Sequence, residues 1–300
     1  MTPLKIYLCR QNHIIIGDVF EEIKKCNVLI KGPMVTPRAG EPWPNLVSAN
    51  SLLRRGLELF AAVRPIKIPD KNIDWTFFRE NTEGAYAVGS KGVHVTDDLA
   101  MDFVVATTEG CERISRLAYD YAKRNGKNRV SVVSKANVIK TTDGKFLNIA
   151  KKIGEEYPEI TTDEWYIDIL TAKLIDEKRR RDFRVFILPN LYGDIISDLC
   201  AGLVGGLGFA PSANIGDSTR IYEAVHGSAP DIAGQDKANP SAILMAFAMM
   251  LNDLGETDKA AKLNAAILAQ VEEGKVVTAD IGGTAGTKEF TQAIISRLAE

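Results

Sequence analysis

The sequence predicts an α/β fold, with helices packed over a sheet, and three observations carry this prediction. Strand-like runs alternate with helix-like runs along most of the chain, which is typical of helices that cover a sheet. The length of 300 residues fits two domains or one large α/β unit. Apolar residues make up 45% of the chain and charged residues 25%, the usual balance for a globular protein with a buried core.

The individual elements are predicted from local patterns. Four strand-like runs are rich in β-branched and aromatic residues and are bounded by turn residues, at 27–32, 75–80, 129–136 and 184–190. Helical patterns lie among them at 111–124, 146–157 and 169–183. The last hundred residues are mostly helical, with patterns at 241–255, 258–274 and 288–300.

Two stretches interrupt or end these patterns. The Gly- and Pro-containing stretch 205–216 is a candidate hinge or crossing between domains. The basic run 178–182 is interpreted as the solvated end of a helix, where positive charge is favoured, rather than as an anion-binding patch.

Composition argues against several classes of protein. A formal net charge of −2 predicts neither nucleic-acid nor membrane binding. The longest strongly apolar run, 242–251, has ten residues, too few to cross a bilayer. The four cysteines show no CxxC spacing, and the first residues lack the ordered regions of a signal peptide. We therefore expect a cytoplasmic protein with reduced thiols.

Common nucleotide and metal signatures are missing from the sequence. It contains no GxGxxG after a strand, which argues against an ordinary Rossmann dinucleotide site, and neither GxxxxGK[ST] nor HExxH. Three histidines make a histidine-rich metal site implausible.

Several charged or polar residues stand in uncommon contexts. Arg54 and Arg64 lie in "SLLRRGLELFAAVRP", and Arg79 ends a strand-like run. Guanidinium groups bind carboxylates bidentately, so three that converge would suit a substrate with two or three carboxylates; the alternative is three unrelated surface arginines. Lys140, at a strand-to-helix junction, is either a desolvated base or a solvated loop residue. Tyr86 lies in a Gly-containing loop, where packing is the alternative role.

The stretch "NLYGDIISDLC" places Asp194 and Asp198 four residues apart, on one face of a helix. Like charges at this spacing destabilise a helix by a few tenths of a kcal/mol, and no Lys or Arg lies between Arg184 and Arg220 to offset them. A hard divalent cation such as Mg²⁺ would explain the pair, because it takes one or two carboxylates plus substrate atoms. The alternative, a solvated acidic face, is disfavoured by the apolar and Gly neighbours.

Five segments together resemble motifs of the decarboxylating β-hydroxyacid dehydrogenases, the isocitrate and isopropylmalate dehydrogenases. They are "SANSLLR" with the later "RP", "FRENTEGAY", "KANVIKTTDG", "NLYGDIISD" and "HGSAPDIAG", in the family's order and at its spacings. The resemblance runs from about Gly17 to the C-terminus. It implies a non-Rossmann α/β fold with two α/β domains and an active-site cleft between them. The cofactor domain would be at about 1–60 plus 205–300, and the substrate, metal and dimerisation domain at about 61–204.

The resemblance also implies roles for single residues. Tyr86 would be the general acid that protonates the enol after decarboxylation. Lys140 would come from the partner subunit of a homodimer with shared active sites and help remove the hydroxyl proton. Asp168 would cross the same interface and join Asp194 and Asp198 on Mg²⁺ or Mn²⁺. The carboxylates of a 2-hydroxy polycarboxylate substrate would be held by Ser48, Asn50, Arg54, Arg64 and Arg79.

The implied cofactor-binding residues are Thr36, Glu223, His226, Gly227, Ser228, Ala229, Asp231, Ile232 and Asn239. Relatives that use NADP resemble "HGTAPKYAG" here, with Lys and Tyr near the 2′-phosphate, whereas this chain has Asp231 and Ile232. A carboxylate accepts hydrogen bonds from ribose hydroxyls and repels a phosphate. Ala279, with no arginine nearby, stands where NADP users have a Tyr and an Arg, so NAD is predicted.

The N-terminal segment departs from the family pattern. Members usually begin with a strand, "GDGIGPE", a long helix and another strand. Here about sixteen unfamiliar residues precede "GDVFEEIKKCNVLIKGP". We therefore expect an N-terminally shortened cofactor domain that lacks about forty family residues, with a cost to stability and cofactor affinity. The chain would be either the truncated start of a longer gene product or a shortened variant.

The predicted function is metal-dependent oxidative decarboxylation of isocitrate to 2-oxoglutarate with reduction of NAD. Alternatives within the family are 3-isopropylmalate, homoisocitrate and tartrate dehydrogenases. Polar Ser48 and Asn50 argue against isopropylmalate, whereas "ADIGGTAGTKEF" resembles isopropylmalate and NAD-type members. An alternative of another class is a non-catalytic regulatory subunit or an inactive fragment.

Overall fold

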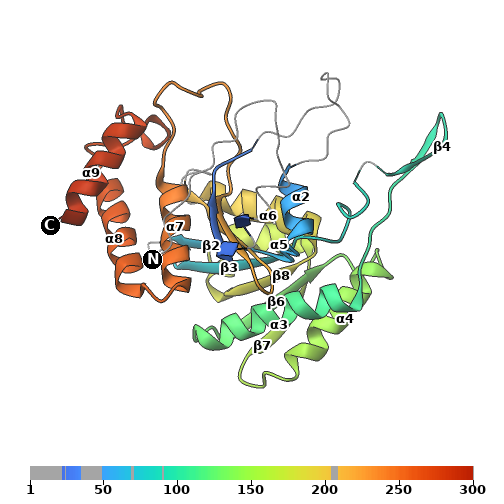
Figure 1. Cartoon of the computed structure of the whole chain (residues 1–300). Helices are drawn as coiled ribbons and strands as arrows, with labels where there is room; N and C mark the ends of the chain where they lie inside the picture. The colour runs from blue at the N-terminus through green and yellow to red at the C-terminus, as the bar shows by residue number, and fades with distance from the viewer. Residues whose placement is uncertain are drawn as a thin grey trace.

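The computed structural model describes residues 22, 23, 25–34, 49–68, 71–89, 91–203 and 209–299. Eight of its strands form one mixed sheet with helices on both faces, and two more form a separate hairpin (Figure 1). The sheet strands are β1 (Val28–Lys31), β2 (Ala61–Ile68), β3 (Ile73–Glu80), β6 (Arg129–Ser134), β7 (Thr161–Tyr166), β8 (Val185–Leu188), β9 (Pro211–Ile215) and β10 (Arg220–Ala224). The hairpin strands are β4 (Val93–Thr96) and β5 (Leu99–Met101).

The described helices alternate with the strands and then dominate the C-terminal part of the chain. They are α2 (Ala49–Gly56), α3 (Thr108–Arg124), α4 (Thr142–Gly154), α5 (Ile167–Ile175), α6 (Asn190–Leu203), α7 (Ser241–Asp253), α8 (Thr257–Glu273) and α9 (Thr287–Ala299). Two short 3₁₀ turns are η2 (Arg180–Asp182) and η4 (Ala279–Ile281).

The strand order across the sheet is β1-β10-β9-β2-β3-β8-β6-β7. The pairs β3–β8, β8–β6 and β6–β7 are parallel, as is β1–β10, whereas β9 and β2 join the two parallel parts through antiparallel pairs. The two parts predicted as separate domains therefore share one continuous sheet. They join where β2 pairs with β9. The division into two domains itself stays a prediction.

Burial on both faces explains why the run at 184–190 is apolar without alternation. In β8, Val185 and Ile187 point into the core under α3 and α4, while Phe186 and Leu188 point into the core under α5 and α6. A strand covered by helices on both faces needs apolar residues at successive positions. Further along the sheet, α7 packs on β9 and β10, and α8 and α9 add a second helical layer (Figure 1).

The α/β prediction is confirmed, but two local expectations were wrong. The helix expected at 169–183 ends at Ile175, because the Asp176 side chain accepts from the N–H groups of Lys178 and Arg179 and starts a turn. The basic run 178–182 is therefore in this turn and in η2, beyond the helix end. The stretch 205–216, expected as a hinge or a crossing between domains, contains β9, a strand in the middle of the sheet, so the hinge alternative was wrong.

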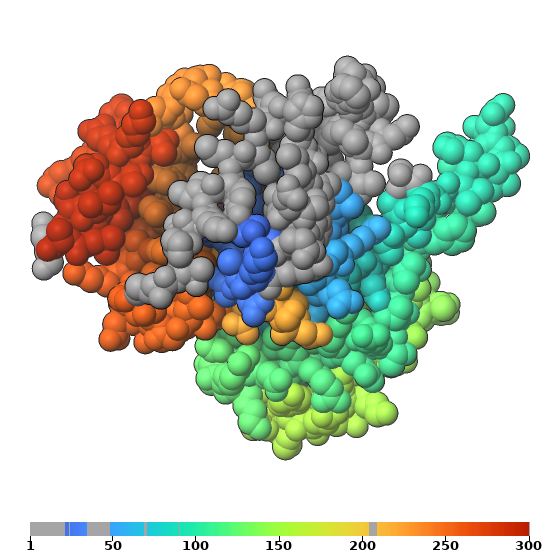
Figure 2. Space-filling model, viewed as in Figure 1, coloured from blue at the N-terminus to red at the C-terminus, as the bar shows by residue number. Residues whose placement is uncertain are grey.

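The β4–β5 hairpin extends away from the rest of the molecule (Figure 2). It carries the half-exposed apolar side chains of Val93, Val95, Leu99 and Met101. None of the described helices is long and apolar enough to span a membrane.

Candidate active site

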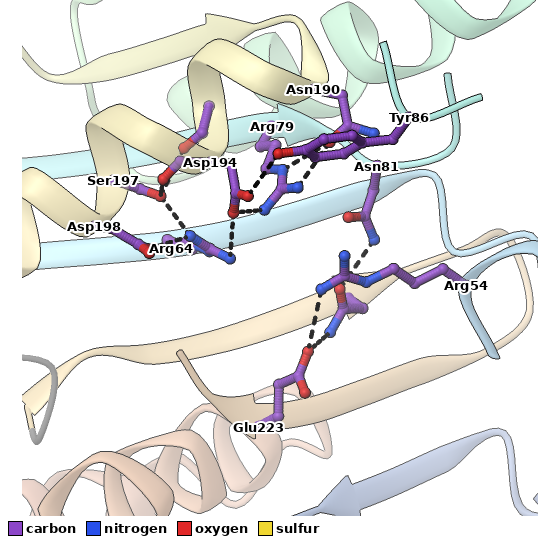
Figure 3. Close-up of polar contacts among 12 residues, drawn as sticks. Arg54, Arg64, Arg79, Asn81, Tyr86, Asn190, Asp194, Ser197, Asp198 and Glu223 are labelled. Atoms are coloured by element: carbon purple, nitrogen blue, oxygen red, sulfur yellow. Dashed lines mark hydrogen bonds and ion pairs between the residues drawn. The ribbon is translucent and has the colours of Figure 1, made fainter. Parts of the chain in front are cut away.

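Helix α6 carries two aspartates to the face of the sheet where β2 and β3 present arginines (Figure 3). Asp194 and Asp198 are one helical turn apart. Ala62 on β2 pairs with Arg79 on β3, and residues two apart on a strand share a face, so Arg64 and Arg79 point to the same side of the sheet. Four charged groups from three elements thus converge.

Arg64 and Arg79 offset the negative charges of both aspartates. Arg64 Nη1 donates to Asp198 Oδ1 at 2.9 Å, and Arg64 Nη2 lies 3.6 Å from Asp194 Oδ1. Arg79 Nη1 forms a second ion pair with Asp194. The expectation that the acids lack basic neighbours was therefore wrong, because β2 and β3 supply charge that is more than a hundred residues away in sequence.

Arg79 is held deep in the protein, with 2% of its surface exposed. Its Nε and Nη2 both donate to Asn190 Oδ1, at 3.0 and 2.7 Å. Burial, together with the nearby charge of Arg64, lowers the pKa of Arg79 to about 9. This value is still above neutral pH, so the guanidinium stays charged. Burial also raises the pKa of Asp198, and the pairing with Arg64 opposes that rise.

Tyr86 lies over this group of charges. Its hydroxyl donates to Asp194 Oδ2 at 3.1 Å, and the Arg79 guanidinium lies 5.8 Å from the ring centroid (Figure 3). Partial burial and then the Asp194 carboxylate raise the pKa of Tyr86 above that of a free tyrosine. The phenol is therefore protonated at neutral pH and can donate a proton.

A polar cavity connects the predicted substrate residues to the predicted cofactor residues. It holds about 410 Å³, counting the open space at its mouth. The walls include Asn50, Arg54 and Arg64 on one side and Glu223, His226 and Gly227 on the other. Asn50 Oδ1 and Arg64 Nε are buried and have no hydrogen-bond partner among the described residues. An acceptor and a donor are thus left for a polar ligand.

Glu223 joins the two sides of the cavity. It is 9% exposed, lies 3.7 Å from Arg54 and 2.5 Å from Lys31, and accepts from Asn214 at 2.6 Å. Burial alone would raise its pKa, but the charges of Lys31 and Arg54 outweigh burial and hold the pKa of Glu223 below its usual value. The carboxylate is ionised at neutral pH.

The rest of the predicted cofactor segment forms an exposed turn after β10. Ile232 N donates to Ala229 O at 3.1 Å, and Asp231 is exposed, with no ion pair among the described residues. Ser228 lies in the same turn. Asn239 is buried at the start of α7, where its Nδ2 donates to Asp280 at 3.0 Å and its Oδ1 accepts from Ser241 N.

Two predicted site residues lie away from this cluster in the single chain. Lys140 is exposed in the turn between β6 and α4. Asp168 is exposed at the start of α5, and its carboxylate pairs with Lys135 at 2.7 Å, which lowers its pKa. The assignment of both residues to the active site of a partner subunit stays a prediction. Ser48 and Thr36 lie outside the described residues.

The donor set on α6 suits a hard divalent cation. Asp194 and Asp198 offer carboxylate oxygens from one helical face, and Mg²⁺ needs one or two protein carboxylates besides substrate and water. No group of three His, Cys, Asp or Glu side chains gathers within the part of the chain that the structure describes.

Sequence reasoning missed Lys31 and Asn190. Lys31 ends β1 and faces Glu223 because β1 and β10 are parallel and pair Lys31 with Glu223. The carboxyl ends of adjacent parallel strands meet at one edge of a sheet, but using this signal requires the strand order, which the sequence does not state. Asn190, between a strand-like run and a helical one, carries a local signal only as a helix-initiating residue.

The comparisons with known proteins agree on one family. A family model described as isocitrate/isopropylmalate dehydrogenase matches residues 6–294. The NAD isocitrate dehydrogenase alpha subunit of Macaca fascicularis mitochondria is 40% identical over 293 residues, which are 95% of this chain and 82% of that protein. A mitochondrial NAD isocitrate dehydrogenase catalytic subunit of Arabidopsis thaliana is 43% identical over 296 residues, 96% of this chain and 77% of that protein.

A solved structure agrees as well. The crystal structure of isocitrate dehydrogenase from Methylococcus capsulatus superposes with a TM-score of 0.86 at 39% identity, covering 94% of this chain and 85% of that one.

Proposed function

The chain belongs to the isocitrate/isopropylmalate dehydrogenase family and is an NAD-dependent decarboxylating dehydrogenase, and we propose that it oxidises isocitrate to 2-oxoglutarate. One observation carries the choice of substrate class. Arg54 and Arg64 line one cavity, and Arg64 and Arg79 both lie beside Asp194. Three guanidinium groups suit a substrate with three carboxylates.

The arginines would exchange partners when substrate binds. Arg64 and Arg79, both largely buried, now form ion pairs with Asp194 and Asp198. A substrate carboxylate would replace the aspartates as their partner. The unpartnered Asn50 Oδ1 and Arg64 Nε would bind the substrate's polar groups in the same cavity.

The aspartates released in this exchange are the residues that would hold Mg²⁺ or Mn²⁺, with Asp168 of a partner subunit as the third carboxylate. When bound, the metal supplies Lewis-acid polarisation of the substrate's hydroxyl oxygen. Tyr86 would deliver the final proton to the enol carbon, since its raised pKa keeps the phenol protonated. Lys140 of the partner would accept the hydroxyl proton.

The choice of NAD is supported by the turn that follows the cavity. Asp231 is exposed there, and its charge has no basic partner among the described residues. Placed beside the adenosine ribose, this carboxylate would accept from a 2′-hydroxyl and repel a 2′-phosphate. Ala279 begins η4 and offers no positive charge to a phosphate.

We also propose a homodimer in which each subunit completes the other's active site. Its support is the apolar surface left uncovered in one chain. The β4–β5 hairpin exposes Val93, Val95 and Leu99 by 43–48%, and Ile195 on α6 is 59% exposed beside Asp194. Apolar patches of this kind mark interfaces. Sedimentation of the purified protein at the mass of a single chain would contradict the dimer.

A cytoplasmic location stays part of the proposal and is checked by cell fractionation. It rests on reduced cysteines, of which the described Cys26, Cys111 and Cys200 are free. No observation favours nucleic acid or membrane as a partner, given the net charge of −2.

The experiment that tests the substrate is an assay of NAD reduction with Mg²⁺ across isocitrate, 3-isopropylmalate, homoisocitrate and tartrate. We expect isocitrate to give the highest kcat/KM. A higher value for one of the other acids would replace the proposed substrate within the family. No turnover of any of them, with ligand binding retained, would favour a non-catalytic subunit.

A further inference from the structure

Asn190 holds the inner edge of the most buried arginine in the site. It is 2% exposed and is the first residue of α6, directly after Pro189. Its single oxygen accepts from both Nε and Nη2 of Arg79, at 3.0 and 2.7 Å. This leaves Arg79 Nη1 as the donor that points to Asp194 (Figure 3).

The other end of the same amide holds the loop that carries Tyr86. Asn190 Nδ2 donates to the backbone oxygen of Glu83 at 2.9 Å. Gly84 packs against Asn190 so closely that a side chain at Gly84 would begin 3.0 Å from Asn190 Cβ, and its backbone φ is +77°. The amide orientation is fixed, because a flipped amide would set its NH₂ group against the guanidinium.

The neutrality of Asn190 matters as much as its geometry. A carboxylate in this place would form a buried ion pair with Arg79 and reduce the attraction of Arg79 for an anionic substrate. An amide accepts two hydrogen bonds while leaving the positive charge uncompensated. Arg79 is therefore oriented by Asn190 without being neutralised by it.

We propose that Asn190 is a positioning residue that sets two groups at once, turning Arg79 toward the substrate's carboxylate and fixing the Tyr86 loop so that the Tyr86 hydroxyl points at the same place. The inference rests on the proposed function, because it concerns the residues that would bind and protonate the isocitrate-derived intermediate. It predicts that substrate affinity and proton transfer both depend on a residue that touches neither reactant.

The test compares Asn190→Ala and Asn190→Asp with the wild type. For each protein, kcat and KM for isocitrate are measured with Mg²⁺ and NAD, together with dissociation constants for isocitrate–Mg²⁺ and for NAD by calorimetry. Asn190→Ala removes two hydrogen bonds to a charged group, so we expect kcat/KM to fall by about 10- to 100-fold. Asn190→Asp keeps a hydrogen-bond acceptor for Arg79 but adds a negative charge. We therefore expect this variant to lose kcat/KM mainly through weaker binding of isocitrate.

Asn81→Ala is the matched control. Asn81 is 5% exposed and close to Arg79 in sequence, but its amide donates to Leu59 O and Asn214. We expect it to lower the melting temperature while isocitrate affinity stays near the wild-type value. NAD affinity should be retained in both Asn190 variants, since the hydrogen bonds of the Asn190 side chain go to Arg79 and Glu83, and neither of these residues lines the polar cavity.

The outcomes distinguish a failure of the positioning role of Asn190 from a failure of the proposed function. Wild-type turnover with unchanged kcat/KM in both Asn190 variants overturns the positioning role alone. Equal losses of NAD and isocitrate affinity in the Asn190 variants also overturn it, because that is the result of general misfolding. A wild type that neither binds nor oxidises isocitrate overturns the proposed function, and the inference with it.

Discussion

The charges of Asp194 and Asp198 illustrate how poorly sequence neighbours predict spatial neighbours. In the sequence the pair has no nearby cation, whereas in the fold Arg64 reaches both acids and Arg79 reaches one. Arginines on antiparallel strands and aspartates on a helix meet because the faces of β2, β3 and α6 are in contact. The acids are therefore partners of the substrate arginines as well as candidate metal ligands.

This pairing changes the stability that the repulsion between Asp194 and Asp198 alone would predict for Asp194→Asn. Relief of repulsion between the two acids would leave the metal-free protein no less stable. Loss of the ion pair instead leaves the buried Arg79 without a charged partner. We expect a free energy of unfolding lower by about 1 kcal/mol or more without metal, together with nearly abolished turnover.

Chemical denaturation in the presence of a chelator measures this change. Asp217→Asn, an exposed aspartate in the turn between β9 and β10, is the control for loss of a carboxylate. Unchanged stability of Asp194→Asn with activity retained would mean that neither the ion pair nor the metal role holds.

Gly193 sets how closely helix α6 approaches strand β3. A Cβ at this position would lie 2.6 Å from both Cβ and Cγ of Arg79, so the helix or the arginine would have to move. Gly202, on the same helix, has open space where its Cβ would be. Gly193 and Gly202 therefore allow a matched comparison between a closely packed position and an open one on the same helix.

We expect Gly193→Ala to destabilise the protein by about 1–3 kcal/mol and to lower kcat/KM at least tenfold, because Asp194 and Asp198 shift with the helix. Gly202→Ala should be neutral or stabilising by up to about 1 kcal/mol, since Ala favours a helix more than Gly. Thermal melting and steady-state assays of both variants check this. Equal behaviour of the two variants would contradict the close packing of α6 on β3.

An ion pair between Lys31 and Glu223 joins the ends of β1 and β10. Because Glu223 titrates, the contribution of this ion pair to the stability of the protein depends on pH. The folded pKa of Glu223 lies below its usual value, because the charges of Lys31 and Arg54 outweigh burial. A depressed carboxylate pKa contributes stability above the unfolded pKa, and this contribution is lost as pH falls through the folded value.

Glu223→Gln should therefore be less stable than the wild type at neutral pH, by about 1–3 kcal/mol, and the difference should narrow as pH falls below 4.5. Urea unfolding of both proteins across this range is the measurement. A difference that widens at acidic pH would show that the carboxylate is not stabilised by its neighbours.

Elements with strong local patterns were predictable, and elements defined by distant partners were not. The apolar run of β8 and the periodic α3 are visible in the sequence, because burial on both faces and a helical stripe leave local signatures. The stretch 205–216 was read as a hinge or a crossing between domains because its Gly and Pro residues resemble a loop, yet it contains β9, which pairs between β10 and β2. The extended runs of β2 and β10 also went unrecognised.

At the scale of the molecule, the motifs are far apart in the chain and become one site through the sheet order. Arg64 and Arg79 come from β2 and β3, and Glu223 lies near the end of β10, two strands beyond β2. Family motifs predicted which residues would meet, but spacing alone could not, because the crossovers fix the strand order. Lys140 and Asp168 show the limit of what a single chain can test, since their predicted site lies in a second chain.

The preference for NAD over NADP tests whether the exposed turn after β10 faces the bound cofactor. The wild type should prefer NAD over NADP by at least about 100-fold in kcat/KM, because an unpaired like-charge contact costs several kcal/mol. Asp231→Lys combined with Ile232→Tyr should shift the preference toward NADP, though incompletely, because no arginine stands near Ala279. Equal use of both cofactors by the wild type would place Asp231 away from the ribose.

The most direct test of the whole account is the product balance of the wild-type enzyme with isocitrate, NAD and Mg²⁺. The proposed reaction should yield equal amounts of NADH and 2-oxoglutarate, and a chelator should stop the formation of both. NADH without 2-oxoglutarate, or neither product under conditions in which another 2-hydroxy acid is oxidised, would contradict the account.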